Sequence, residues 1–153
     1  MRFDYIDPLV TTTQEVLDCT LHQTVSRGEV AVLQGDSIYG DVVVSVRITG
    51  DSEGDLLLSM DDLTALRICS TLTGDRIDTL TPENLDALVE LGNMIAGNAV
   101  SALNDLGFDF SILPPKVSVR THAASSLFKR EALRIPLMSD CGEVDVNVFL
   151  GAE

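Results

Sequence analysis

The residues best suited to chemistry lie in the segment 81–107, which the sequence predicts to be a helix. Thr81-Pro82 suits the start of this helix, and Gly107 suits its end. At about 100° per residue, one ridge of the helix carries Asp86, Glu90, Asn93 and Gly97. A carboxylate gains from a charge-assisted hydrogen bond, and a carboxamide can both donate and accept. The ridge therefore presents an acid and an amide to solvent.

Two features distinguish this ridge from an ordinary helix surface. Apolar side chains flank it, with Val89 and Val100 on one side and Met94 on the other, which suits a contact surface that becomes dry on binding. Gly97 costs about 1 kcal/mol relative to Ala in a helix interior, and close approach of another backbone would explain it. An exposed Glu/Asn pair is nevertheless common on helix surfaces, so residue types alone leave both interpretations open.

The rest of the sequence predicts one α+β domain over residues 1–153. A first helix is expected from Asp7-Pro8 to about residue 27, and a second from the cap Asp61-Asp62 to just before Gly74. Strands are expected at 30–33, 41–47, 55–60, 116–121, 133–139 and 144–150. The resulting order, α-βββ-α-α-βββ, suggests two related halves. An antiparallel sheet with helices packed on one face is the simplest arrangement.

Charge and composition limit the partners. The net charge of -14 argues against binding to nucleic acid or anionic lipid, because like charges repel. The sequence has no apolar run long enough to span a bilayer and no signal-peptide pattern at its start, so we expect a cytoplasmic protein without membrane contact. Cys19, Cys69 and Cys141 lie far apart without a CxxC pair. We expect them to be small buried hydrophobes, and we predict no metal site.

The segment 86–99 (DALVELGNMIAGNA), followed by Pro115, resembles the signature of the CheC/CheX/FliY phosphatase family. That signature is Asp or Ser, then Glu four residues later, Asn three residues after the Glu, and a downstream Pro. The opening Tyr5-Ile6-Asp7-Pro8 is also similar to the start of CheX-type chains. The resemblance covers essentially the whole chain, including the order of its helices and strands.

This resemblance implies a CheX-type chemotaxis phosphatase that dephosphorylates the phosphoaspartate of a CheY-like response regulator. Asn93 would orient the attacking water, and Glu90 would pair with a lysine of the regulator. Asp86, Val89, Met94, Gly97 and Val100 would belong to the partner-binding surface. Mg²⁺ would be bound by the regulator, so we expect no cofactor of the chain's own.

Two other functions stay open from the sequence. A non-catalytic module could bind a phosphorylated receiver domain and only sequester it, although the intact Glu90/Asn93 pair favours catalysis. A structural relative of flagellar switch components would not be expected to keep the complete motif.

Some family members carry the motif on two helices. The equivalent place in the first half, near 14–18, offers Glu-xx-Asp without an amide, so we expect one complete site.

The family resemblance also implies a homodimer that pairs through its sheets. A late strand such as 143–149 is expected to supply the edge for that pairing.

Overall fold

The computed structural model describes residues 3–34, 38–122 and 131–149. Within these residues the helices are α1 (Phe3–Leu21), α2 (Asp62–Thr73) and α3 (Pro82–Asp105). The strands are β1 (Ser26–Arg27), β2 (Ala31–Gln34), β3 (Tyr39–Gly50), β4 (Gly54–Met60), β5 (Phe110–Ile112), β6 (Lys116–His122), β7 (Glu131–Ser139) and β8 (Gly142–Phe149).

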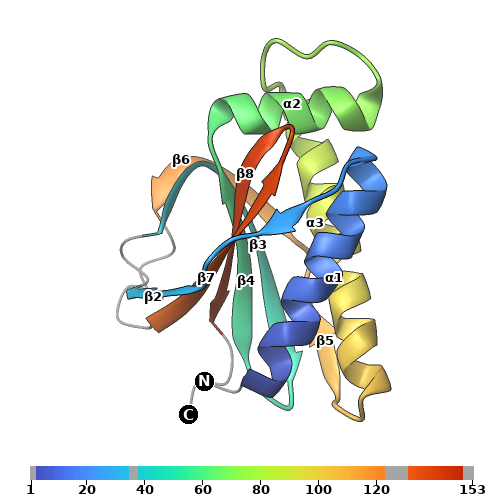
Figure 1. Ribbon diagram of the computed structural model, residues 1–153, viewed down its shortest axis with the longest axis vertical. Helices are drawn as coiled ribbons and strands as arrows, with labels where there is room; N and C mark the ends of the chain where they lie inside the picture. Colours follow the sequence, from blue (N-terminus) through green and yellow to red (C-terminus); the bar gives the residue numbers. More distant parts are fainter. Residues whose placement is uncertain (1–2, 35–37, 123–130, 150–153) are drawn as a thin grey trace.

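All eight strands form one antiparallel sheet in the order β1-β7-β8-β4-β3-β5, with β2 also paired to β7 and β6 also paired to β3. Helices α1 and α3 lie side by side over one face of this sheet, and α2 crosses one end (Figure 1). The predicted α+β class, the antiparallel sheet and the placement of the helices are confirmed. No helix in the described part is both long and apolar enough to cross a membrane.

The sheet consists of two related halves that exchange their outer strands. The hairpins β3–β4 and β7–β8 meet where β4 pairs with β8 at the centre. Strands β1 and β2 of the first half pair with β7 of the second, whereas β5 and β6 of the second half pair with β3 of the first. Gly28 N donates to Pro136 O (2.8 Å) between β1 and β2, and Leu113 N donates to Arg47 O (3.0 Å) between β5 and β6. The pairing of β1 and β2 with β7 is therefore interrupted at the position that corresponds to the interruption between β5 and β6 in the other half.

Two helices begin and end where the sequence predicts. The Asp61 carboxylate accepts a hydrogen bond from Thr64 N at the start of α2 (2.7 Å), and Thr81 caps α3 in the same way. Gly74 and Gly107 follow the two helices with left-handed φ angles of +78° and +100°, which glycine adopts without a steric penalty.

The predicted bounds of the first helix are wrong. Helix α1 begins by Phe3 and contains Pro8, because the burial of apolar side chains on its first turns outweighs one missing backbone hydrogen bond. It ends at Leu21, since Asp18 Oδ1 accepts from Val25 N (2.6 Å) and Gln14 Nε2 donates to Val25 O (2.7 Å), which ties the chain back onto the helix. Strands β1 and β5, of two and three residues, were not predicted.

The expectation that 143–149 forms a sheet edge is also wrong. Strand β8 pairs with β7 on one side and with β4 on the other, so both of its edges are occupied.

The prediction that all three cysteines are buried is correct for two of them. Cys69 and Cys141 are buried, but Cys19 is exposed on α1.

The main core lies between the sheet and the helices. It takes alternate residues of the central strands, such as Val44, Leu58 and Val146, together with the apolar faces of all three helices. The opposite face of the sheet buries a smaller cluster: Ile38, Val43, Leu57, Ala132 and Phe149. Burial on both faces explains why the central strands are more apolar than a one-sided alternation requires.

A partly buried acid lies on that opposite face. The residue is Asp145 of β8, whose Oδ1 is buried and has no hydrogen-bond partner within the described residues. Burial and, after it, the neighbouring Glu143 carboxyl together raise the pKa of Asp145 to about 7, against the opposing effect of Arg134. Asp41 and Asp61 line the same cavity of about 440 Å³, so the surroundings are acidic.

We expect Asp145→Asn to stabilise the protein at alkaline pH. The folded-state pKa of about 7 exceeds the ordinary 3.8, so the folded state retains a proton that the unfolded state has lost. Stability therefore falls as pH rises from about 4 to about 7. Discounted for partial exposure, the variant should gain on the order of 1 kcal/mol at pH 8 and little at pH 4.5. Urea unfolding across this range, with exposed Asp75→Asn as the control, measures the effect. An equal gain at both pH values would contradict it.

Candidate functional site

Helix α3 holds its ridge in place through a close approach at Gly92. A Cβ added to Gly92 would lie 2.6 Å from Val44 Cγ1 and 3.8 Å from Pro115 Cβ. The helix therefore packs nearer to β3 than any larger residue would allow. The same contact places Pro115, just before β6, beside the helical turn that carries Asn93. The proline that completes the sequence pattern is thus next to that pattern in space.

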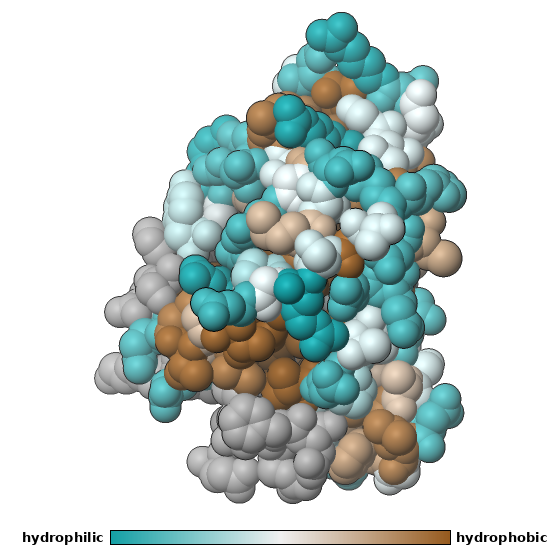
Figure 2. All heavy atoms as spheres, viewed as in Figure 1, coloured by the Kyte–Doolittle hydropathy of each residue, from teal (hydrophilic) through white to brown (hydrophobic). Residues whose placement is uncertain are grey.

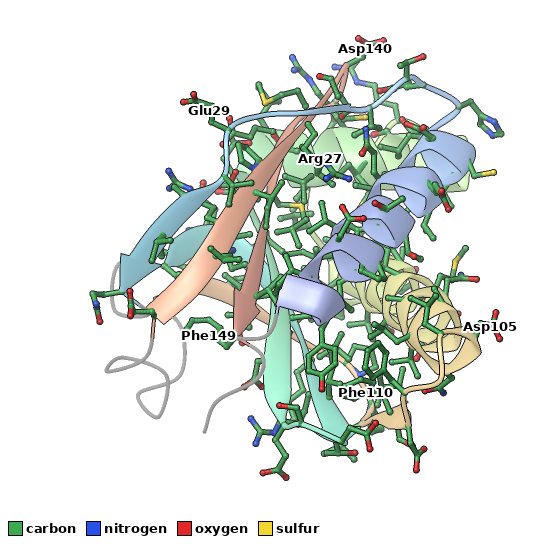
Figure 3. All side chains as sticks on the ribbon, turned by 60° about the horizontal axis from the view of Figure 1, so that its bottom comes forward. Arg27, Glu29, Asp105, Phe110, Asp140 and Phe149 are labelled. Atoms are coloured by element: carbon green, nitrogen blue, oxygen red, sulfur yellow. The ribbon has the colours of Figure 1, made fainter. Side chains whose placement is uncertain are left out.

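The C-terminal end of α3 is fixed by hydrogen bonds and by aromatic rings. Asn104 Oδ1 accepts from Phe110 N (2.8 Å), and Asn104 Nδ2 donates to Phe110 O (3.2 Å), which joins the helix to β5. The ring of Tyr5 meets those of Phe108 and Phe110 edge-on, with centroids 4.9 Å and 5.0 Å apart. Figure 3 shows Phe110 at the end of the molecule where α1 begins and α3 ends. Both helices are therefore anchored at this end.

The predicted ridge is present on α3 and faces solvent. Asp86, Glu90 and Asn93 are all exposed, as the helical spacing predicts. Gly97 is half-buried, but a Cβ added there would meet no atom within 4 Å, so the space beside it is open. The ridge therefore offers an acid and an amide on a rigid support, with room for a partner close to Gly97.

The predicted flanks of the ridge differ from one another. Met94 is 40% exposed and Val89 is half-buried, so both can reach a partner. Val100 is only 8% exposed and belongs to the main core. The expectation that Val100 forms part of the contact surface is wrong, because its side chain packs into the main core.

An open groove of about 500 Å³ runs between α1 and α3 on the Met94 side of the ridge. Asn98 and Ser101 of α3 line it opposite Thr12 and Cys19 of α1, and Glu15 and Asp105 add two carboxylates. Its lining therefore mixes polar and apolar side chains and is acidic. Among the described residues, no group of three or more His, Cys, Asp or Glu side chains is placed to hold a metal ion.

The place equivalent to this ridge on α1 is not at 14–18, as the sequence suggested. Asp18 ties α1 to Val25 as Asn104 ties α3 to Phe110. Residues 14–18 therefore correspond to the last turns of α3, beyond the motif.

Asp7 takes the position of Asn93 in the first half. It lies eleven residues before Asp18, as Asn93 lies eleven residues before Asn104. Like Asn93, it is exposed and directly follows two buried residues. Asp7 Oδ1 lies 3.6 Å from Arg27 Nη1 of β1, and the position carries no amide. The motif is therefore incomplete on α1, for a different reason from the one that the sequence suggested.

Comparison with known proteins identifies the family. The family profile described as "Chemotaxis phosphatase CheX" matches residues 42–137, more than half of the chain. The chain belongs to the CheX family. It is 31% identical over 116 residues to the CheY-P phosphatase CheX of Thermotoga maritima, with 73% of each chain covered.

Solved structures of CheX proteins have the same fold. The crystal structure of a CheX–CheY–BeF3–Mg²⁺ complex from Borrelia burgdorferi matches with a TM-score of 0.83 at 32% identity, covering 99% of this chain and 100% of that chain. CheX from Desulfovibrio desulfuricans matches with a TM-score of 0.83 at 27% identity, covering 97% and 100%. A CheC-like superfamily protein from a Shewanella species shares the fold at 22% identity and a TM-score of 0.85, covering 99% and 100%.

We expect the two glycines of the α3 segment to respond oppositely to alanine. Gly92→Ala would force its Cβ against Val44 and should destabilise the protein by about 1–3 kcal/mol. Gly97→Ala meets open space and should stabilise the helix by about 0.5–1 kcal/mol. Urea unfolding of both variants at one pH measures the difference. If Gly92→Ala unfolds at the same urea concentration as the wild type, α3 is not held by this contact.

Proposed function

We propose that this chain dephosphorylates the phosphoaspartate of a CheY-like response regulator, with Glu90 and Asn93 as the catalytic pair. The observation that carries the proposal is the exposed acid and amide on one ridge of α3, in a chain of the CheX family. The Thermotoga relative is named a CheY-P phosphatase, and the Borrelia relative was crystallised with CheY. Both names support the same class of substrate.

Asn93 serves the reaction by positioning water. The water oxygen attacks phosphorus, the bond from phosphorus to the aspartate oxygen breaks, and the products are inorganic phosphate and a free carboxylate. The carboxamide of Asn93 can accept a hydrogen bond from the water and donate another, which holds the water in line with the bond that breaks. Mg²⁺ bound by the regulator offsets the charge on the phosphoryl oxygens. The chain therefore needs no cofactor of its own.

Glu90 serves to hold the complex together. One turn of helix separates it from Asn93, so both side chains can enter the same pocket of a partner. A carboxylate that pairs with a lysine gains a charge-assisted hydrogen bond once water is excluded. Asp86, Val89, Met94 and Gly97 extend the contact surface along the ridge and its flanks. Neither Glu90 nor Asn93 has to accept a proton for this mechanism.

A sequestering module is the second candidate function. It would use the same ridge to bind a phosphorylated receiver domain without shortening the lifetime of the phosphoryl group. The amide at Asn93 favours catalysis, because binding alone does not require a group that both donates to and accepts from a water molecule.

We expect Asn93→Ala to lower kcat for phosphoregulator hydrolysis about 100-fold or more, because the water loses its orienting group. Asn98→Ala is the matched control, since Asn98 is an exposed asparagine of the same helix that faces the α1 groove. Loss of phosphate from a phosphorylated, Mg²⁺-bound CheY-like regulator gives the rate. Titration with the BeF3-activated regulator gives the affinity, which the Asn93 variant should retain.

This experiment distinguishes phosphatase activity from sequestration. Wild-type chain that binds the activated regulator but leaves the phosphate lifetime unchanged or longer would establish sequestration instead. Glu90→Gln should mainly weaken binding, since the charge-assisted bond is lost while the amide remains. A Glu90→Gln variant with normal affinity would remove the clamping role.

We also propose that the chain forms a homodimer through an edge of its sheet. With β8 central, the outer strand near the second hairpin is β2, which pairs with β7 among the described residues. Val32 of β2 is 62% exposed, and Val30, just before β2, is 56% exposed. Figure 2 shows apolar surface gathered over β2 and β7, beside the first turns of α1. An edge strand with exposed valines is suited to pairing with a second copy.

We expect Val32→Asp to turn the dimer into a monomer, because a second copy would bury the added carboxylate without a partner. Light scattering coupled to size exclusion at micromolar concentration gives the mass. A wild-type monomer at that concentration would refute the dimer. A variant that stays dimeric would place the interface elsewhere.

A further inference from the structure

Strand β6 runs along the flank of α3 opposite the α1 groove. Pro115, just before β6, lies at the level of Gly92, whereas Val119 of β6 and Leu85 of α3 line one hollow. The seven residues from Gly92 back to Leu85 span about 10 Å of helix, and the four from Pro115 to Val119 span about 13 Å of strand. Strand β6 is therefore close to α3 at both ends of this segment, beside Gly92 and across the hollow from Leu85.

The hollow at the far end of this flank has a volume of about 370 Å³ and lies between α2, the first turns of α3 and β6. We call it the β6 hollow. Its apolar walls come from Leu66, Leu80, Leu85 and Val119. At its rim, Arg120 Nη2 and Asp62 Oδ2 form an ion pair at 2.5 Å. Val119 is 43% exposed there, so an apolar side chain on an edge strand faces solvent beside the ridge.

The two flanks of the ridge suit different contacts. The α1 groove carries two carboxylates, Glu15 and Asp105, and no basic side chain is among the described residues that line it. The β6 hollow is mainly apolar, and its polar rim carries Asp62 and Asp78 together with Arg120, the one basic side chain among the described residues that line the two cavities. Viewed down the helix from Gly92, Asn93 lies at about 100° and Glu90 at about 160°. Since Gly92 contacts Pro115, Asn93 is the member of the pair nearer to β6.

We propose that the phosphorylated receiver domain docks over the β6 flank and seats an apolar side chain in the β6 hollow. The inference rests on the proposed phosphatase function and extends its contact surface from α3 to β6. The receiver is the occupant because the hollow continues the ridge: Leu85 precedes Asp86, and Val89 bridges the distance to Asn93. Leu85 and Val119 then help to determine which regulator is accepted, whereas Asn93 determines the chemistry.

The test compares Val119→Asp with an aspartate variant at the other end of α3. Val119→Asp should raise KM for the phosphorylated regulator at least tenfold and lower affinity for its BeF3-activated form equally, because docking would bury an unpaired carboxylate. Its kcat at saturating regulator should stay within about twofold. Leu106→Asp adds a carboxylate at an exposed apolar residue just after the far end of α3, away from the hollow, and should leave affinity unchanged. Val119→Ile should retain binding, which separates lost contact from lost folding.

Each outcome is informative. If the wild type is active and Val119→Asp has the wild-type KM, the docking proposal fails while the phosphatase function stands. If the wild type binds the activated regulator without hydrolysis, the phosphatase function fails, and the affinity of Val119→Asp still decides the docking. If Val119→Asp turns a wild-type dimer into a monomer, a second copy occupies the hollow and the proposal is overturned.

Discussion

The contact between Gly92 and Val44 is the constraint on which the rest of the site depends. A helix can approach a sheet this closely only where one residue lacks a Cβ, and here that residue directly precedes Asn93. The contact fixes the height of α3 above β3 and the distance of Pro115 from the helix. A chemistry that works by holding water in line tolerates little displacement. The position of the Asn93 amide is therefore set by a packing contact on the buried side of the same helix.

The two halves of the molecule differ mainly in the side chains that their long helices present to solvent. Helices α1 and α3 share their burial pattern, their place over the sheet and their ties to the following strand. In one half the outward position is Asp7, which lies beside Arg27; in the other it is Asn93. The fold supplies two equivalent platforms, and the side chains on each platform decide whether it can act.

Local signals were predictable from the sequence, whereas relations between distant segments were not. The caps at Asp61 and Thr81 act within one turn, so the starts of α2 and α3 could be predicted. The end of α1 depends on a tie to Val25, which no helical propensity encodes. The central position of β8 depends on strand pairing across about ninety residues, which a pattern of alternating residues does not reveal.

The same division holds for the site. The spacing of Asp86, Glu90 and Asn93 is enough to place them on one ridge, because a helix fixes that geometry locally. The loss of Val100 to the core depends on the tilt of α3 against its neighbours. The β6 flank depends on a strand more than twenty residues further along the chain. Residues that act are thus easier to predict than the surfaces that surround them.

The exchange of outer strands between the two halves affects how the chain folds during synthesis. Because each half completes the sheet of the other, neither half has a finished sheet of its own. A growing chain cannot pair β4 with β8 until β8 has left the ribosome, so the central sheet closes in a step that follows the synthesis of both halves. Until that step, β4 has an open edge, and newly made chains depend on rapid closure to avoid joining one another.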